Sequence, residues 1–210
     1  MTQKHNDDRR QKIHTWLSDR HIGSAYDPAP IYPEVRAFLS SDLPYVSGRI
    51  RKLPHWELDG STYFVTFGVL NRKPLLVPRR IPDFCPASIL EEVIWSFNSD
   101  LYRLEAYVIM PDHVHLLLTP FQDYTLGSIL RRIKGGAALG INRYLGRKGQ
   151  FWQGDSFDHL IRNNEDWLDK FNYIHENPVN CGLVRLPQDY PFSSLVTMHS
   201  ADRMESFGRM

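Results

Sequence analysis

The sequence predicts a single α+β domain with a ferredoxin-like architecture, in which an antiparallel sheet carries helices on one face. Three observations support this prediction. The chain has 210 residues, a length that suits one compact domain with appended arms. Its hydrophobic fraction of 42%, with five Trp, ten Tyr and eleven Phe, is enough to build one core. The periodic segments follow the order strand, helix, strand, strand, helix, short strand, helix, which is typical of a split βαβ arrangement.

The first strand and the first core helix are predicted before residue 100. Residues 62–70 are rich in aromatic and β-branched side chains and follow a Gly-Ser turn, which favours a strand. Residues 89–97 carry apolar side chains at helical spacing, and Ser88 is available as the N-cap. Two further strands are predicted at 104–110 and 113–119. They are joined by a tight Pro-Asp connection and should pair antiparallel.

The second half of the chain predicts two helices with short strands between them. Residues 125–145 repeat apolar side chains at helical spacing, although a Gly-Gly pair at 135–136 favours a kink or break. Strand-like segments follow at 151–153 and 157–161.

The last helix is predicted over residues 164–177. Asn163 or Asn164 would cap its start, and acidic residues occupy its first turn. Pro178 is expected to end it, and an irregular tail follows.

The domain is predicted at residues 49–195, between an arm at 1–48 that is part helix and part loop and a tail at 196–210. No apolar stretch approaches the roughly 20 residues that cross a bilayer, and the polar opening lacks the apolar core of a signal peptide. We therefore expect a cytoplasmic protein. Cys85 and Cys181 form no CxxC pair or disulfide framework and are predicted to be free thiols.

A net charge of +1 conceals a local run of positive charge. Between residues 125 and 150 the chain has no Asp or Glu. Six basic residues lie there, and we call them the basic block: Arg131, Arg132, Lys134, Arg143, Arg147 and Lys148. Such a run favours contact with nucleic acid, while a solvated helix face is the ordinary alternative.

His113 and His115 are a candidate metal pair. Side chains alternate along a strand, so these two imidazoles should share one face while Val114 points to the other. Two adjacent imidazoles can hold a divalent metal. A pair of sheet histidines with ordinary hydrogen-bond partners is the alternative, because H-x-H alone does not specify a metal.

Tyr173 and Asn177 are four residues apart on the last predicted helix and should share a face. This spacing would bring a phenol and a carboxamide oxygen together. The alternative is that the tyrosine packs in the core and the asparagine ends the helix before Pro178. Spacing alone does not distinguish Tyr173 from the other tyrosines.

Several motifs, in order from about residue 49 to Leu195, resemble the REP-associated tyrosine transposases. These are HUH single-strand transposases related to insertion-sequence transposases. The motifs include Pro-Asp-His-Val-His at 111–115 and Tyr-Ile-His-Glu-Asn-Pro at 173–178. The remaining matching segments are 51–56, 63–67, 108–110, 116–118, 151–153, 157–162 and 179–184.

The resemblance implies the ferredoxin-like HUH nuclease fold. It implies that His113 and His115 bind Mg²⁺ or Mn²⁺, that Asn177 completes the metal site, and that Tyr173 is the nucleophile. The implied activity is cleavage and strand transfer of single-stranded DNA at REP-type hairpins through a 5′-phosphotyrosine, which is DNA transposition. The implied partner is hairpin-bearing single-stranded DNA at the nucleoid, bound by a monomer or homodimer.

Asn180 and Cys181 depart from the family pattern, in which a basic residue and a small residue or His are more usual. This departure concerns DNA contacts rather than the chemistry. A DNA-binding protein of the same fold without cleavage, acting as a repressor or structural factor, is the main alternative. A replication initiator or relaxase is disfavoured by the motif at 173–178, and a small-molecule metallohydrolase is disfavoured by the basic block.

Overall fold

The computed structural model describes residues 60–81 and 84–196. The arm predicted at 1–48 lies outside these residues, as do the start of the predicted domain at 49–59 and the tail from residue 197. In the described part of the chain, no helix is both long enough and apolar enough to cross a membrane.

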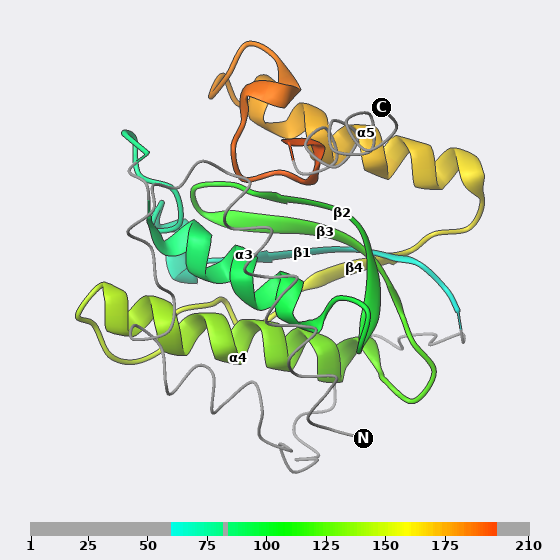
Figure 1. Cartoon of the computed structure of the whole chain (residues 1–210), viewed down its shortest axis with the longest axis horizontal. Coiled ribbons are helices and arrows are strands. Elements are labelled where there is room, and N and C mark those ends of the chain that lie inside the picture. Colours follow the sequence, from blue (N-terminus) through cyan, green and yellow to red (C-terminus); the bar gives the residue numbers. More distant parts are fainter. Residues whose placement is uncertain (1–59, 82–83, 197–210) are drawn as a thin grey trace, which may run out of the picture.

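Four strands form one antiparallel sheet (Figure 1). They are β1 (Tyr63–Gly68), β2 (Tyr102–Ile109), β3 (His113–Pro120) and β4 (Phe157–Leu160). The order across the sheet is β2-β3-β1-β4, and every neighbouring pair is antiparallel. The ferredoxin-like sheet predicted from the order of elements is therefore confirmed.

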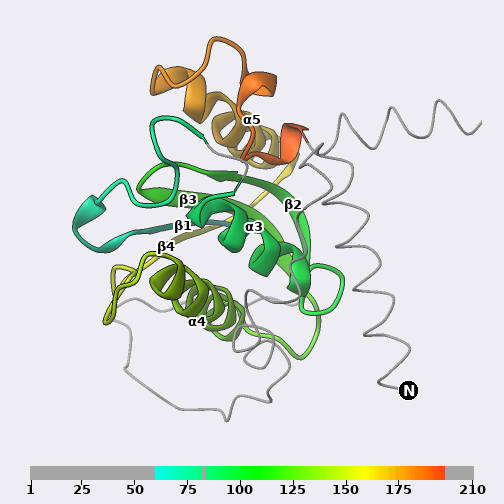
Figure 2. The ribbon, with the colours of Figure 1, turned by 60° about the vertical axis from the view of Figure 1, so that its left-hand side comes forward.

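Helices cover both faces of this sheet. Helices α3 (Pro86–Phe97) and α4 (Leu126–Tyr144) pack beside each other on one face, and α5 (Asn164–Asn180) lies across the other (Figures 1 and 2). The expectation that the helices share one face is thus right for α3 and α4 and wrong for α5. Both faces of the central strands are apolar enough to be buried, so each needs a cover.

Side-chain alternation along β3 supplies the core on both faces. Val114, Leu116 and Leu118 are buried on one face, while Leu117 is buried between them on the other. Helix α4 presents the apolar face predicted by its periodicity, and its buried residues are Leu126, Ile129, Leu130, Ile133, Gly136, Ala137, Gly140 and Ile141. Burial on both faces fixes the register of β3, because a slip of one residue would exchange its two sets of side chains.

Two helix starts differ from each other in how they are capped. Helix α3 begins three residues earlier than predicted, with Cys85 as its N-cap. Ser88 is at the third helical position, where its hydroxyl accepts the Cys85 N–H at 3.3 Å, so its assignment as the N-cap was wrong. Helix α5 begins as predicted, with the Asn163 side chain accepting the Asp166 N–H at 2.8 Å.

Two predicted helix interruptions and one predicted strand differ in the structure. Helix α4 continues through Gly135 and Gly136 without a break, because its apolar face is packed along its whole length. Helix α5 continues past Pro178 to Asn180; the missing proline N–H removes one backbone donor near the end of the helix, and this loss does not end it. Residues 151–153 form only a bridge between Trp152 and Val69 rather than a strand.

The segment after α5 closes the open edge of β2. It contains the short 3-10 helix Pro187–Asp189 and then runs beside β2, where the Ile109 N–H donates to the Phe192 carbonyl at 2.9 Å. The buried Tyr190 hydroxyl donates to the Ile109 carbonyl at 2.8 Å. The Ser194 hydroxyl lies 2.8 Å from Nε2 of His175 on α5. These contacts tie α5 to the sheet.

Candidate active site

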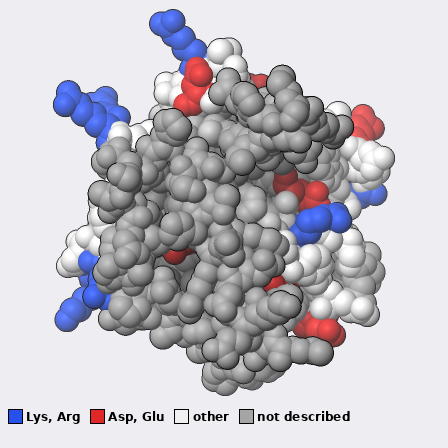
Figure 3. Space-filling model, in the orientation of Figure 1, with Lys and Arg blue, Asp and Glu red and all other residues white. Residues whose placement is uncertain are grey.

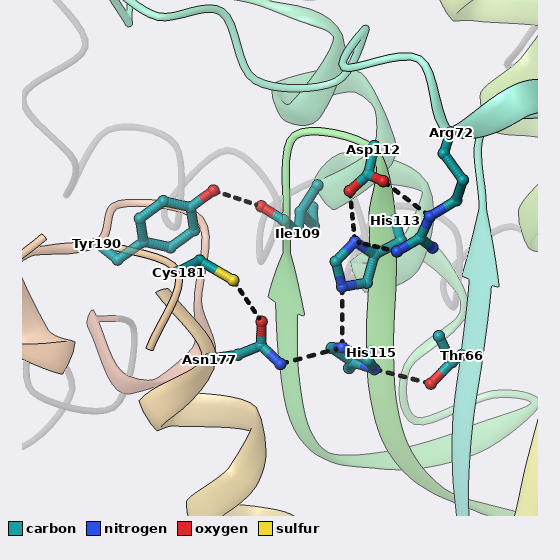
Figure 4. A network of polar contacts seen from close by, with 9 residues as sticks. All are labelled: Thr66, Arg72, Ile109, Asp112, His113, His115, Asn177, Cys181 and Tyr190. Carbon is teal, nitrogen blue, oxygen red and sulfur yellow. Dashed lines mark hydrogen bonds and ion pairs between the residues drawn. The ribbon is translucent and has the colours of Figure 1, made fainter. Parts of the chain in front are cut away.

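His113 and His115 lie side by side on the face of the sheet that α5 covers (Figure 4). Their rings are nearly perpendicular, and the two Nε2 atoms are 3.1 Å apart. The prediction from strand alternation that these imidazoles share one face is confirmed. His115 is buried at 4% exposure. The pair therefore lies largely out of solvent, under α5.

The other nitrogen of each ring has its own partner. Nδ1 of His113 lies 2.6 Å from Oδ1 of Asp112, and Nδ1 of His115 lies 2.7 Å from the Thr66 hydroxyl on β1. A carboxylate only accepts, so the bond with Asp112 places the proton of neutral His113 on Nδ1. With the Thr66 hydroxyl accepting in the same way from His115, both Nε2 lone pairs point into the gap between the rings.

Burial keeps both imidazoles neutral. Burial, with smaller contributions from the neighbouring His113 and Arg72, lowers the pKa of His115 to about 3. The pKa of His113 is also lowered, first by burial, although the Asp112 carboxylate opposes the shift. Neutral imidazole is the form that binds metal ions, so the pair is ready to act as ligands at neutral pH.

The geometry of the pair fits one octahedral cation. Two ligands at a right angle, each about 2.1 Å from a shared ion, are about 3 Å apart, close to the distance between the two Nε2 atoms. Two lone pairs that face each other across such a gap repel unless a cation or a proton lies between them. The pair therefore has the donor atoms and the spacing that a divalent ion requires.

Asn177 on α5 is next to this pair. Its Nδ2 lies 3.3 Å from Nε2 of His115, and its Oδ1 accepts the Cys181 thiol at 3.6 Å (Figure 4). Turning the carboxamide about its terminal bond would exchange the two ends and direct Oδ1 at the histidines. Among the described residues no group of three His, Cys, Asp or Glu could hold a metal, so a carboxamide would have to supply the third ligand.

Tyr173 lies one helical turn before Asn177 and shares its face of α5, as the spacing predicts. Its ring packs edge-on against the rings of His115, at 5.3 Å between centroids, and Phe64, at 5.8 Å. The side chain is nevertheless 48% exposed. A phenol that is open to solvent beside a paired-histidine site can reach an external phosphate.

Two other tyrosines have structural roles. The Tyr144 hydroxyl donates to the Phe84 carbonyl at 3.3 Å, on the opposite side of the sheet from α5. The Tyr190 hydroxyl is engaged in the core, and burial raises its pKa well above the ordinary value. Neither can replace Tyr173 beside the histidine pair.

The sequence reading missed the residues that orient the histidines. Asp112 was interpreted only as a turn residue, and Thr66 only as part of a strand. Strand alternation places Thr66 on one known face of β1, but its pairing with His115 requires the β1–β3 register. Arg72 was also missed: its Nε lies 2.8 Å from Oδ2 of Asp112, and it adopts a left-handed φ of 54°.

The basic block lies on α4 and the turn after it, across the sheet from the histidine pair. The Lys134 amine donates to the Gln153 carbonyl at 3.0 Å, and the Arg147 guanidinium donates to the Gln150 carbonyl at 3.1 Å. In the view of Figure 3, the described Lys and Arg side chains are scattered rather than gathered into one patch, and Asp and Glu side chains lie near those at the top and on the right. The fold therefore does not bring the basic block to Tyr173.

Comparison with known proteins assigns the family. The family model for IS200-like transposases matches residues 61–177, which is more than half of the chain and contains the histidine pair, Tyr173 and Asn177. The chain belongs to the IS200-like transposase family. Its enzyme class is therefore that of the DNA transposases that use a tyrosine nucleophile.

Two relatives extend this assignment to REP-associated tyrosine transposases. The REP-associated tyrosine transposase of Escherichia coli (strain K12) is 30% identical over 141 residues, which cover 66% of this chain and 79% of that protein. A solved structure of a REP-associated tyrosine transposase bound to a REP hairpin aligns with a TM-score of 0.58 and 28% identity. The alignment covers 70% of this chain and 84% of that one. The resemblance predicted from the motifs is confirmed.

Proposed function

We propose that this transposase is a metal-dependent single-stranded DNA endonuclease and strand-transferase that acts on hairpin DNA through a covalent 5′-phosphotyrosine. The observation that carries the proposal is the exposed Tyr173 ring packed against His115, whose Nε2 faces that of His113 at 3.1 Å. In this proposal, α5 and β3 hold the Tyr173 nucleophile and the two imidazoles on the same face of the sheet.

His113, His115 and Asn177 would hold the cation. Two imidazoles and one carboxamide leave several coordination positions open, which suits Mg²⁺ or Mn²⁺ better than a closed structural zinc site. When bound, the ion supplies Lewis-acid polarisation of a phosphate oxygen. Asp112 and Thr66 keep the two Nε2 atoms free of protons, because each is the partner of the opposite ring nitrogen.

Tyr173 performs the covalent step. Its hydroxyl oxygen attacks the scissile phosphorus, the bond to the 3′-oxygen breaks, and that oxygen leaves as a 3′-hydroxyl after taking up a proton. The phenol releases its own proton to solvent or to a base at the site. The product is a 5′-phosphotyrosine that keeps the energy of the phosphodiester. A second DNA 3′-hydroxyl can therefore attack it, restore the phenol and complete strand transfer.

The substrate is proposed to be single-stranded DNA that folds into a hairpin. A tyrosine fixed on a rigid helix must meet one phosphate in line, and a flexible strand beside a hairpin allows this more readily than a regular duplex. The solved relative bound to a REP hairpin supports the same choice. The basic block would contact the backbone of a part of the DNA that extends past the edge of the sheet to α4. We expect the protein to act at the nucleoid, as a monomer or a homodimer.

The decisive experiment looks for the covalent adduct. The protein and Mn²⁺ are incubated with labelled single-stranded oligonucleotides that carry palindromes from its own genome, and the products are separated on a denaturing gel. The wild type should form a labelled protein band. Tyr173→Phe should lose the adduct and keep its DNA affinity, because only the hydroxyl is removed.

Tyr144→Phe is the matched control, since it removes the same atom from the other face of the sheet. It should form the adduct normally. An adduct in Tyr173→Phe would show that another residue is the nucleophile. Specific hairpin binding by the wild type without any adduct would favour a DNA-binding factor that has lost cleavage.

A further inference from the structure

Phe157 is an exposed aromatic residue on the edge strand of the sheet. It is 61% exposed, whereas Phe64 and Phe67 on the neighbouring strand are buried. Strand β4 is short and lies at the end of the sheet, next to β1. A single exposed apolar side chain is common on protein surfaces, so the position of Phe157, rather than its exposure alone, is what points to a ligand.

The strand register places Phe157 in line with the histidine site. Phe157 is paired with Thr66, and Thr66 is paired with His115. Directly opposed residues of antiparallel strands point to the same face, so all three side chains lie on the face that α5 covers. With neighbouring strands about 4.8 Å apart, Phe157 is roughly 10 Å from His115 along this row.

The buried Phe64 ring connects the exposed ring to the site. It stacks on His115 at 5.4 Å between centroids, meets Tyr173 edge-on, and meets Phe157 edge-on at 6.5 Å. Phe157 is thus supported on its inner side and open on its outer side. Lys170 of α5 adds a positive charge, with its Nζ 5.7 Å from the centre of the Phe64 ring.

We propose that Phe157 is a stacking platform for a base of the single strand that Tyr173 cuts, with Lys170 contacting a neighbouring phosphate. The inference rests on the proposed function, because it assumes that the DNA strand passes beside Tyr173. An aromatic face with a cation beside it is the combination that binds single-stranded nucleic acid without sequence preference. A second copy of the chain pairing along β4 is a different occupant, which the experiment separates.

The test measures binding in EDTA, so that no strand is cut. Hairpin oligonucleotides carry a single-stranded flank of about ten thymidines on either the 5′ or the 3′ side, a length within the usual range for such sites. A matched set carries abasic residues in the flank, which keep the phosphates and remove the bases. Fluorescence anisotropy gives the dissociation constant for each oligonucleotide.

On one of the two sides, the wild type should bind the thymidine flank about 5- to 100-fold more tightly than the abasic flank, the range expected for stacking of one base. Phe157→Ala should lose most of this difference and leave the affinity for the abasic flank unchanged. Phe157→Trp should keep it, because the aromatic face remains. Leu168→Ala is the matched control: it removes another exposed apolar side chain, from α5, and should change neither affinity.

Two results would overturn the inference. One is a thymidine preference that survives in Phe157→Ala. The other is a wild-type dimer in analytical ultracentrifugation that Phe157→Ala converts to monomer without altering the preference, which would assign the ring to a dimer contact. The binding test does not involve cleavage, so the two proposals can fail separately. If the wild type shows the base preference but forms no adduct, only the proposed chemistry is refuted. If it forms the adduct but shows no base preference, only the stacking site is refuted.

Discussion

In the proposed site, Thr66 accepts from Nδ1 of His115 and so holds this histidine in the tautomer that metal binding needs. Thr66→Val tests this proposed role with almost no change in shape. Valine keeps the β-branched form that suits a strand and removes only the hydroxyl. In the wild type that hydroxyl lies 2.7 Å from Nδ1 of His115, in a site where the ring is almost fully buried. The variant leaves the Nδ1–H without a partner.

The free energy of unfolding should fall only modestly. A buried N–H without a partner costs about 1–3 kcal/mol. His115 can avoid part of this cost by moving its proton to Nε2 and donating to Nε2 of His113, which is 3.1 Å away. We therefore expect a loss near the low end, about 1 kcal/mol. The same rearrangement removes the lone pair that the cation needs, so Mn²⁺ affinity should fall roughly 10- to 100-fold.

Urea denaturation without metal measures the first quantity, and isothermal titration calorimetry with Mn²⁺ measures the second. Thr62→Val is the matched control, because it also removes a threonine hydroxyl bond, the 2.8 Å contact with Thr119. It should lower stability to a similar degree and leave Mn²⁺ affinity unchanged. A folded Thr66→Val protein with wild-type Mn²⁺ affinity would refute the assignment of Nε2 of His115 as a ligand.

The remaining predictions concern the other ligands, the thiols and the basic block. His113→Ala should abolish Mn²⁺ binding and adduct formation. Asn177→Ala should weaken both less completely, because water replaces a neutral oxygen ligand more readily than an imidazole. Equal losses in the two variants would contradict this order. Iodoacetamide should modify the exposed Cys181 in the native protein and Cys85 only on unfolding. Cys85 is buried, and burial raises the pKa of its thiol. Peptide mass spectrometry would show the order in which the two thiols react. Replacing the first two arginines of the basic block by alanine should lower the slope of log affinity against log salt by roughly 1.4 to 1.8 in total if both contact phosphates, and an unchanged slope would leave them as a solvated helix face.

The sequence by itself determined the features that depend on local periodicity. Alternation along a strand placed His113 and His115 on one face, and a spacing of four on a helix placed Tyr173 beside Asn177. Each of these spatial relations involves only a few neighbouring residues and does not depend on how the rest of the chain folds. The order of helices and strands along the chain was also predictable, because each element carries its own period.

Only the tertiary structure decided how these local units meet. Nothing local specifies that α5 covers the face opposite α3 and α4, because that choice depends on where the chain crosses the sheet. The partnership of Thr66 with His115 and the alignment of Phe157 with both depend on strand register between segments far apart in sequence. Likewise, the basic block falls within one short stretch of the chain, yet its position on α4 and the following turn places it on the opposite side of the sheet from Tyr173. Periodicity fixes which side chains share a face, whereas packing fixes which faces come together.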